Sequence, residues 1–149
     1  MKLLTALLDQ VPEFTRLLSC IDSGGCPAAV SGLSLVHRAH FAAGVFASTG
    51  RTTVLLCADE GEADRLSADL TAFTGQQPLL LFAREFLFHP GAVASRQWEQ
   101  RRLAVMRALL DEKEPQLVVA TPFGLMQRTM PPDRFDRLKR IISASGTYD

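Results

Sequence analysis

The sequence predicts an α/β fold, with a mostly parallel sheet flanked by helices. Residues 52–58 (TTVLLCA) are apolar almost throughout and β-branched at their start, which is typical of a strand buried on both faces of a parallel sheet. Residues 28–31 form a shorter apolar run, and residues 33–47 carry apolar side chains at helical spacing. A strand, a helix and a second strand in this order predict two parallel strands joined by a right-handed crossover.

The first 22 residues predict helical structure. Leucines recur at helical spacing on both sides of Pro12, which a helix cannot accommodate in its interior without a kink. We therefore expect two short amphipathic helices, or one kinked helix, over residues 1–22. Their apolar faces are expected to pack on the sheet domain, and binding of a partner protein is the alternative.

The rest of the chain predicts alternating helices and strands. A helix is expected to open at Asp59 and Glu60, because carboxylates are favourable at a helix N-terminus, and Thr121 with Pro122 is expected to cap a later one. The further elements predicted are, in order, a turn over 75–78, a strand over 79–82, a loop over 84–91, a long helix over 94–112, a strand over 116–121, a short helix to Arg128, a helical turn over 133–139 and a last strand over 140–145.

Length and composition favour one ordinary domain spanning residues 1–149. Of the 149 residues, 47% are hydrophobic, and 16 basic side chains balance 16 acidic ones, so the total charge does not favour tight non-specific binding to nucleic acid. Three cysteines are too few for a disulfide framework, and no apolar run has the length or pattern of a membrane span or a secretory signal. We therefore expect a cytoplasmic, reduced protein without a membrane partner. Residues 143–149 read like the start of a further element, which predicts a fragment excised from a larger multidomain protein.

The turn after residues 28–31 is where a nucleotide phosphate would bind in such a fold, because backbone amides at a helix N-terminus bind anions. A working phosphate loop, G-x-x-x-x-G-K-[ST], supplies glycines for close approach, a lysine for the phosphates and a hydroxyl for magnesium. Here Gly32 and Ser34 keep two of these features, whereas His37 and Arg38 stand near the positions expected for Lys-Thr. The sequence therefore predicts a degenerate phosphate loop that binds no cofactor.

The sequence contains no credible catalytic or metal-binding set. Cys20 and Cys26 could join His37 and His40 as zinc ligands, but the spacings match no standard zinc arrangement, and surface imidazoles are the expectation. Four carboxylates follow the strand over 52–58, where nucleotide hydrolases often hold magnesium, but without a phosphate loop they predict a solvated helix N-terminus. These carboxylates are Asp59, Glu60, Glu62 and Asp64. We therefore expect no enzyme activity and no metal in this chain.

Arginines recur along the predicted long helix. Arg96, Arg101, Arg102 and Arg107 are expected to lie largely on its outer face, where they could contact a polyanion or a partner. A solvated face paired with acids elsewhere is the simpler expectation for these four arginines. Trp98 could stack on a base, but core or loop packing explains it more simply.

Four segments in this order resemble one protein family. They are VSGLSLVHRAHFAA, TTVLLCADEGEADRLSADL, EFLFHPGAVASRQWEQRRLAVMRALL and QLVVATPFGLMQRTMPP. Together they cover nearly the whole chain, and they resemble the N-terminal module of bacterial transcription-repair coupling factors (Mfd). That module is itself similar to the first domain of the excision-repair helicase UvrB. The resemblance implies a degenerate P-loop NTPase or helicase fold.

The resemblance also implies which domain of the parent protein has which function. UvrB carries an intact phosphate loop and a damage-probing hairpin, whereas this chain has GLSLVHR at the turn and a short link over 86–95. In the family, ATP and magnesium serve later DNA translocase domains, RNA polymerase binds another domain, and UvrA binds mainly a small domain that follows this module. The implied function is a non-catalytic scaffold in transcription-coupled nucleotide excision repair, which supports UvrA recruitment and contacts the parent's other domains.

Two other functions stay open at the level of the sequence. The chain could be the nucleotide-binding domain of an active ATPase, with His37 and Arg38 as phosphate ligands, although Leu33 and Leu35 offer bulk where close approach needs glycine. It could also be a DNA-binding module that uses the arginine helix, in which case binding would weaken steeply with salt.

Overall fold

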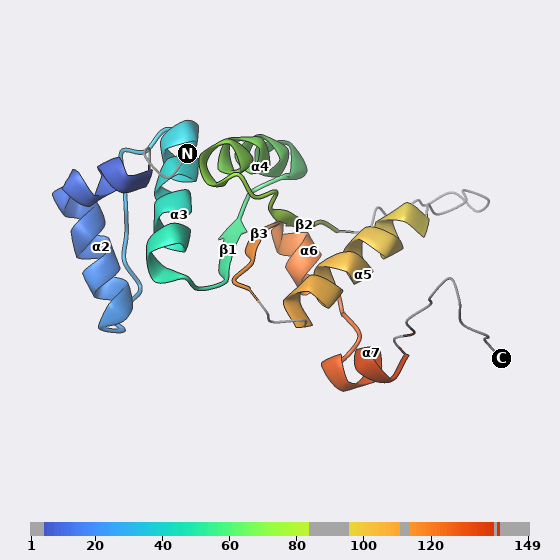
Figure 1. The fold of residues 1–149 in the computed structure, drawn as a ribbon. Coiled ribbons are helices and arrows are strands. Elements are labelled where there is room, and N and C mark those ends of the chain that lie inside the picture. Colours follow the sequence, from blue (N-terminus) through green and yellow to red (C-terminus); the bar gives the residue numbers. More distant parts are fainter. Residues whose placement is uncertain (1–4, 84–95, 111–113, 139, 141–149) are drawn as a thin grey trace.

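The computed structural model describes residues 5–83, 96–110, 114–138 and 140, except for the side chains of Arg96 and Gln97. Within these residues the chain forms an α/β fold (Figure 1). The elements are, in chain order, η1 (Leu7–Gln10), α2 (Pro12–Asp22), α3 (Leu35–Thr49), β1 (Thr53–Leu56), α4 (Glu60–Thr74), β2 (Leu79–Leu81), α5 (Arg96–Leu110), β3 (Leu117–Ala120), α6 (Pro122–Met126) and α7 (Pro132–Leu138). None of these helices combines the length and the apolar composition that crossing a lipid bilayer requires.

The described strands form one parallel sheet in the order β1-β3-β2, which confirms the predicted parallel sheet flanked by helices. The central strand is β3: its Leu117 pairs with Thr53 of β1, and its Val118 pairs with Leu79 of β2. The crossover through α4 runs from β1 past β3 to β2, and the crossover through α5 returns to β3. Right-handed crossovers in opposite directions place their helices on opposite faces, and α4 and α5 do pack on opposite faces of this sheet (Figure 1).

One face of the sheet packs against α3 and α4. Ala39 and Ala43 of α3 and Leu70 of α4 are fully buried against Leu117 and Val119 of β3. These helical residues have the spacing that the sequence predicted for a core-facing side. Both helices end at a glycine in the left-handed conformation, as is common at helix C-termini. The predictions for these two helices are therefore confirmed.

The opposite face of the sheet is only partly covered. Val105 of α5 is buried against β2 and β3, whereas Val54 and Leu56 of β1 are 55% and 59% exposed. The prediction that residues 52–58 are buried on both faces is therefore wrong. The cause is the place of β1 at the edge of the described sheet, because α5 lies over β2 and β3 and leaves β1 uncovered.

Residues 28–31 do not form a strand, so the predicted strand-helix-strand unit that starts there is wrong. The run is short and contains two alanines, and Pro27 before it has no backbone N–H to donate to a sheet. In the structure this segment passes beside α2, where Val30 lines a cavity of about 590 Å³ together with Leu17 and Phe41. The first described crossover therefore starts at β1.

The N-terminal segment forms η1 and α2, and the break between them falls at Pro12 as predicted. Leu8 and Phe14 are buried where α3 has Gly44 in place of a side chain. A Cβ at Gly44 would overlap with Leu8 and lie 2.9 Å from Cζ of Phe14. The Phe14 ring also meets Phe41 edge to face, with ring centroids 5.4 Å apart. This segment therefore packs on the sheet domain through α3.

The caps predicted for two helices are present. Asp59 Oδ1 accepts a hydrogen bond from the Glu62 N–H (2.7 Å), and Thr121 Oγ1 accepts one from the Gly124 N–H (3.2 Å). The helix that Thr121 opens, α6, ends two residues before the predicted end, and α7 covers most of the predicted helical turn. The predicted loop over 84–91 lies outside the described residues. So does the predicted last strand over 140–145, apart from its first residue, which has no regular structure.

Candidate functional site

The residues of the predicted degenerate phosphate loop lie in the turn that leads into α3, although no strand precedes this turn in the structure. Gly32 has a φ of 81°, a backbone conformation that favours glycine. Ser34 stands at the N-cap position of α3, but its hydroxyl lies 3.1 Å from Nδ1 of His37 and makes no capping bond. Leu33 and Leu35 are half-buried on either side of it. The hydroxyl that magnesium would need thus has an imidazole partner, and leucines flank it.

The structure places Arg38 beside the carboxylates that open α4. Arg38 Nη1 lies 3.4 Å from Oε1 of Glu62, although 24 residues separate the two in the chain. The other oxygen of Glu62 accepts a hydrogen bond from the Ala58 N–H at 2.9 Å, and Asp59 caps the same helix. Because Arg38 is largely exposed, the ion pair itself contributes little to stability. The ion pair places the Arg38 guanidinium beside a carboxylate of α4.

The histidines and cysteines considered as zinc ligands have other neighbours. The His40 ring stacks on Phe73, with ring centroids 4.8 Å apart, and the His37 ring faces Ser34. Cys20 and Cys26 lie beside each other at the end of α2. Across the ranges that the structure describes, no three His, Cys, Asp or Glu side chains gather closely enough to hold a metal ion.

Arg102 departs most from its predicted role. The residue is 8% exposed, and its guanidinium donates hydrogen bonds to the carbonyl oxygens of Gly124 (3.0 Å), Gln127 (3.0 Å) and Phe82 (3.4 Å). The expectation that Arg102 lies on the outer face of its helix is therefore wrong. Buried carbonyl groups need hydrogen-bond donors, and this guanidinium supplies them at the end of β2 and around α6. Burial lowers the pKa of the Arg102 guanidinium from its ordinary value.

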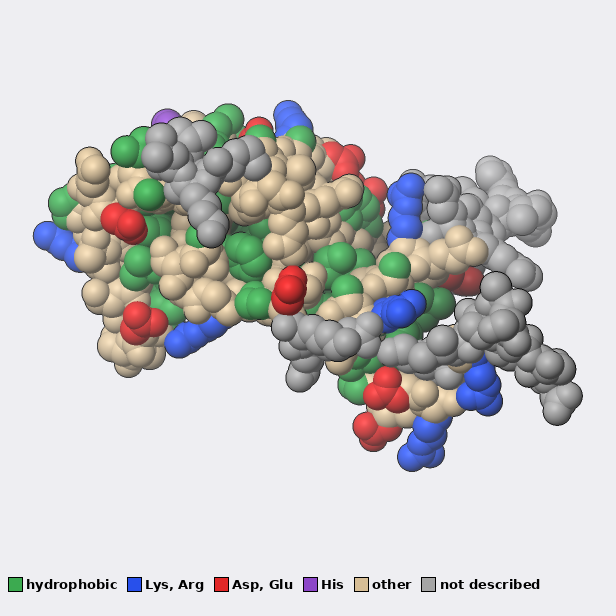
Figure 2. Space-filling model, viewed as in Figure 1, with side chains coloured by type: hydrophobic (Ala, Val, Ile, Leu, Met, Phe, Trp, Pro, Cys, Tyr) green, Lys and Arg blue, Asp and Glu red, His purple; other side chains and the backbone are tan. Residues whose placement is uncertain are grey.

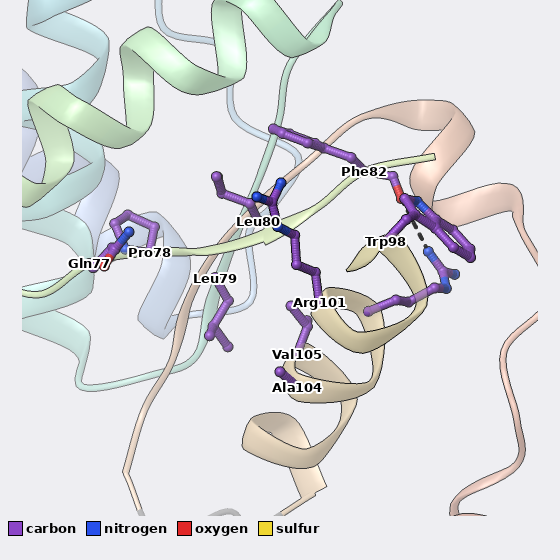
Figure 3. A pocket seen from close by; sticks show the side chains of 10 residues that line it. Gln77, Pro78, Leu79, Leu80, Phe82, Trp98, Arg101, Ala104 and Val105 are labelled. Carbon is purple, nitrogen blue, oxygen red and sulfur yellow. Dashed lines mark hydrogen bonds between the residues drawn. The ribbon is translucent and has the colours of Figure 1, made fainter. Parts of the chain in front are cut away.

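A cavity of about 660 Å³ opens beside β2 and α5 (Figure 3). Leu80 and Val105 are among the apolar side chains that line it, and Arg101 lines it as well. Trp98 also lines this cavity, with its ring centroid 5.8 Å from Cζ of Arg102, which is a cation–π contact. The indole therefore packs on a buried cation, in agreement with the simpler prediction for Trp98.

The four arginines do not form one strip. Arg101 and Arg107 are exposed on α5, Arg102 is buried, and the side chain of Arg96 lies outside the described part. Helix α7 exposes carboxylates as well as arginines at the surface (Figure 2). Contact of a polyanion or a partner with Arg96, Arg101 and Arg107 therefore stays a prediction.

The helical spacing of the sequence indicates that Arg102 faces the core, although arginine is usually an exposed residue. Trp98, Arg102, Val105 and Leu109 recur at intervals of four, three and four residues, which places them on one side of a helix. Val105 and Leu109 pack against the sheet. A cation in line with core residues predicts buried acceptors, and here the acceptors are backbone carbonyls.

Large apolar side chains are exposed on α6 as well as on β1. Phe123 and Met126 are 71% and 79% exposed, and with Val54 and Leu56 we term them the exposed apolar residues. Figure 2 shows hydrophobic side chains that reach the surface among the charged ones. Phe123 and Met126 lie three residues apart on α6, which places them on one side of that helix. Neighbouring exposed apolar side chains are typical of contact with another protein or domain.

Comparisons of the chain with protein-family models, with curated proteins and with solved structures gave no match.

Proposed function

We propose that this chain is a non-catalytic scaffold domain, the UvrB-like N-terminal module of a transcription-repair coupling factor. It supports the recruitment of UvrA by the domain that follows it, and it packs against other domains of the parent protein when repair is not engaged. The observation that carries the proposal is the occupied state of the turn before α3 (residues 31–34), which we term the phosphate turn. There His37 faces Ser34, and Arg38 faces Glu62. The parallel sheet is consistent with the P-loop-like fold that we propose.

The exposed apolar residues support a function in protein contact. Arg102 and the close approach of Gly124 to β2 hold α6 in place, since a Cβ at Gly124 would overlap with the carbonyl oxygen of Leu81. The position of α6 is thus fixed while Phe123 and Met126 face outward. A rigid element with outward apolar side chains is suited to packing against a neighbouring domain, which would remove these side chains from water.

Capture of UvrA tests the scaffold function. The chain alone should not retain UvrA on a resin, and the chain joined to the small following domain should retain it, because we place the recruiting surface in that domain. Equal retention by the two proteins would contradict the proposal and would move the recruiting surface into this domain.

Substitution of an exposed apolar residue tests the packing function in the complete coupling factor. Met126→Ser should raise UvrA capture several-fold. The substitution weakens the packing of this domain against the other domains of the coupling factor, and we propose that this packing keeps UvrA from the recruiting surface. Val36→Ser, at a half-exposed position on α3, is the matched control and should leave capture unchanged. Unchanged capture for both variants would contradict a function of α6 in this packing.

Titration of the chain with magnesium and ATP in a calorimeter should give no saturable heat at concentrations that detect a Kd of about 1 mM. The turn offers no lysine, the Ser34 hydroxyl faces His37, and the guanidinium of Arg38 faces Glu62. A saturable signal that disappears in the variants Arg38→Ala or His37→Ala would show that the turn still holds phosphate. That result would favour the nucleotide-binding alternative.

A further inference from the structure

The end of α2 folds back so that two cysteines come together. The Gly24 N–H donates a hydrogen bond to the carbonyl of Ile21 (3.3 Å), and the Gly25 N–H donates one to the carbonyl of Cys20 (2.9 Å). These two bonds form a Schellman motif, which needs a left-handed residue, and Gly24 supplies it with a φ of 70°. The motif reverses the chain, and Cys26 therefore follows beside the last full turn of α2.

The thiol of Cys20 is directed at the reversed chain. Its Sγ lies 3.1 Å from the carbonyl oxygen of Gly25, the residue that precedes Cys26. A Cβ built at Gly25 would lie 3.3 Å from this Sγ, so the Cys20 thiol lies against the residue next to Cys26. Cys26 is exposed, whereas Cys20 is partly buried. Desolvation raises the pKa of the Cys20 thiol, and the neighbouring Cys26 raises it further. An exposed cysteine thus directly follows the residue that the more protected thiol of Cys20 contacts.

We propose that Cys20 and Cys26 form a reversible dithiol site whose substrate is a low-molecular-weight disulfide such as oxidised glutathione. The thiolate of Cys26 attacks one sulfur of that disulfide and releases a first glutathione thiol, leaving a mixed disulfide on Cys26. Cys20 then gives up its proton, and its thiolate attacks the Cys26 sulfur and releases the second glutathione thiol. Two protein thiols are oxidised to one disulfide, and one glutathione disulfide is reduced to two thiols.

The disulfide would tie the end of α2 to the segment that leads into α3. Cys20 and Val30 line the same cavity beside α2, so the bond closes a covalent ring next to it. The site is separate from the scaffold function proposed above, because it involves neither the phosphate turn nor the exposed apolar residues. It makes the link between the end of α2 and the segment that leads into α3 responsive to the redox state of the surrounding solution.

Equilibration with glutathione tests the site. The whole chain, native or unfolded in urea, is held in buffers of graded reduced-to-oxidised glutathione, quenched with acid, alkylated with N-ethylmaleimide and weighed by mass spectrometry. The native chain should keep its disulfide at ratios at least about tenfold more reducing than the unfolded chain, because the Schellman motif holds the chain at Cys26 next to Cys20. Equal midpoints, or a stable mixed disulfide on Cys26 in the native chain, would overturn the proposal.

Three variants identify the thiols. Cys26→Ser should show no internal disulfide, and Cys20→Ser should accumulate the glutathione mixed disulfide on Cys26, because the second thiol that resolves it is missing. Cys57→Ser is the matched control. Cys57 is buried directly after β1, and its substitution should leave the midpoint unchanged. Loss of the native disulfide in Cys57→Ser would overturn the assignment of Cys20 and Cys26 as the pair.

Discussion

Arg102→Met should lower the free energy of unfolding by about 3 kcal/mol. Methionine fills much of the same space, but it donates no hydrogen bond to the carbonyl oxygens of Gly124, Gln127 and Phe82. The bond to Gly124 is buried, so its carbonyl would lose its donor without gaining water. Urea unfolding followed by circular dichroism measures the change through the shift in midpoint.

Two further substitutions on α5 serve as controls for Arg102. Arg101→Met, one residue away and exposed, should change the free energy of unfolding by less than about 0.5 kcal/mol. Arg102→Lys should recover only part of the loss, because a lysine ammonium lacks the planar fork that reaches several acceptors at once. If Arg102→Met and Arg101→Met had equal effects, the three carbonyl bonds would not contribute measurably to stability.

Phe14→Ala should lower the free energy of unfolding by about 3 to 4 kcal/mol. The Phe14 side chain is fully buried against α3, and its removal leaves a cavity beside Gly44 and ends the edge-to-face contact with Phe41. Thermal unfolding monitored by calorimetry tests the change. Leu7→Ala is the control at an exposed position of the same segment. A loss below about 1 kcal/mol for Phe14→Ala would mean that α2 opens locally without cost to the rest of the domain.

The sequence predicted those elements whose signals are local. The apolar spacing of α3 and α4, the carboxylate cap at Asp59 and the break at Pro12 all depend on residues within one or two helical turns. Residues 28–31 carried a similar local signal, but a strand also needs a hydrogen-bonding neighbour, which no local pattern supplies. The exposure of Val54 and Leu56 was unpredictable for the same kind of reason, since it depends on which strands α5 covers.

The sequence predicted which residue types the candidate site contains, but it did not predict which of these residues contact one another. The missing lysine and second glycine of the phosphate turn can be read directly from the sequence around Gly32. The pairing of Arg38 with Glu62 cannot, because it depends on how two helices pack. Arg102 is intermediate: its position in the helical period was visible, but the carbonyl groups that it binds come from segments 20 to 25 residues away.

The place of β3 at the centre of the sheet has a consequence for the order in which this domain can form. Both described strand pairs involve β3, and β3 is the last of the described strands to be synthesised. Its contacts with the residues around β1 close a loop of 64 residues, so sheet formation costs considerable chain entropy at once. A nascent chain that has not yet reached Leu117 has none of the hydrogen bonds that join these strands. Until then, the sides of α3 and α4 that pack on the sheet lack the central strand that covers them, and exposed apolar surface of this kind makes an incomplete chain prone to aggregation.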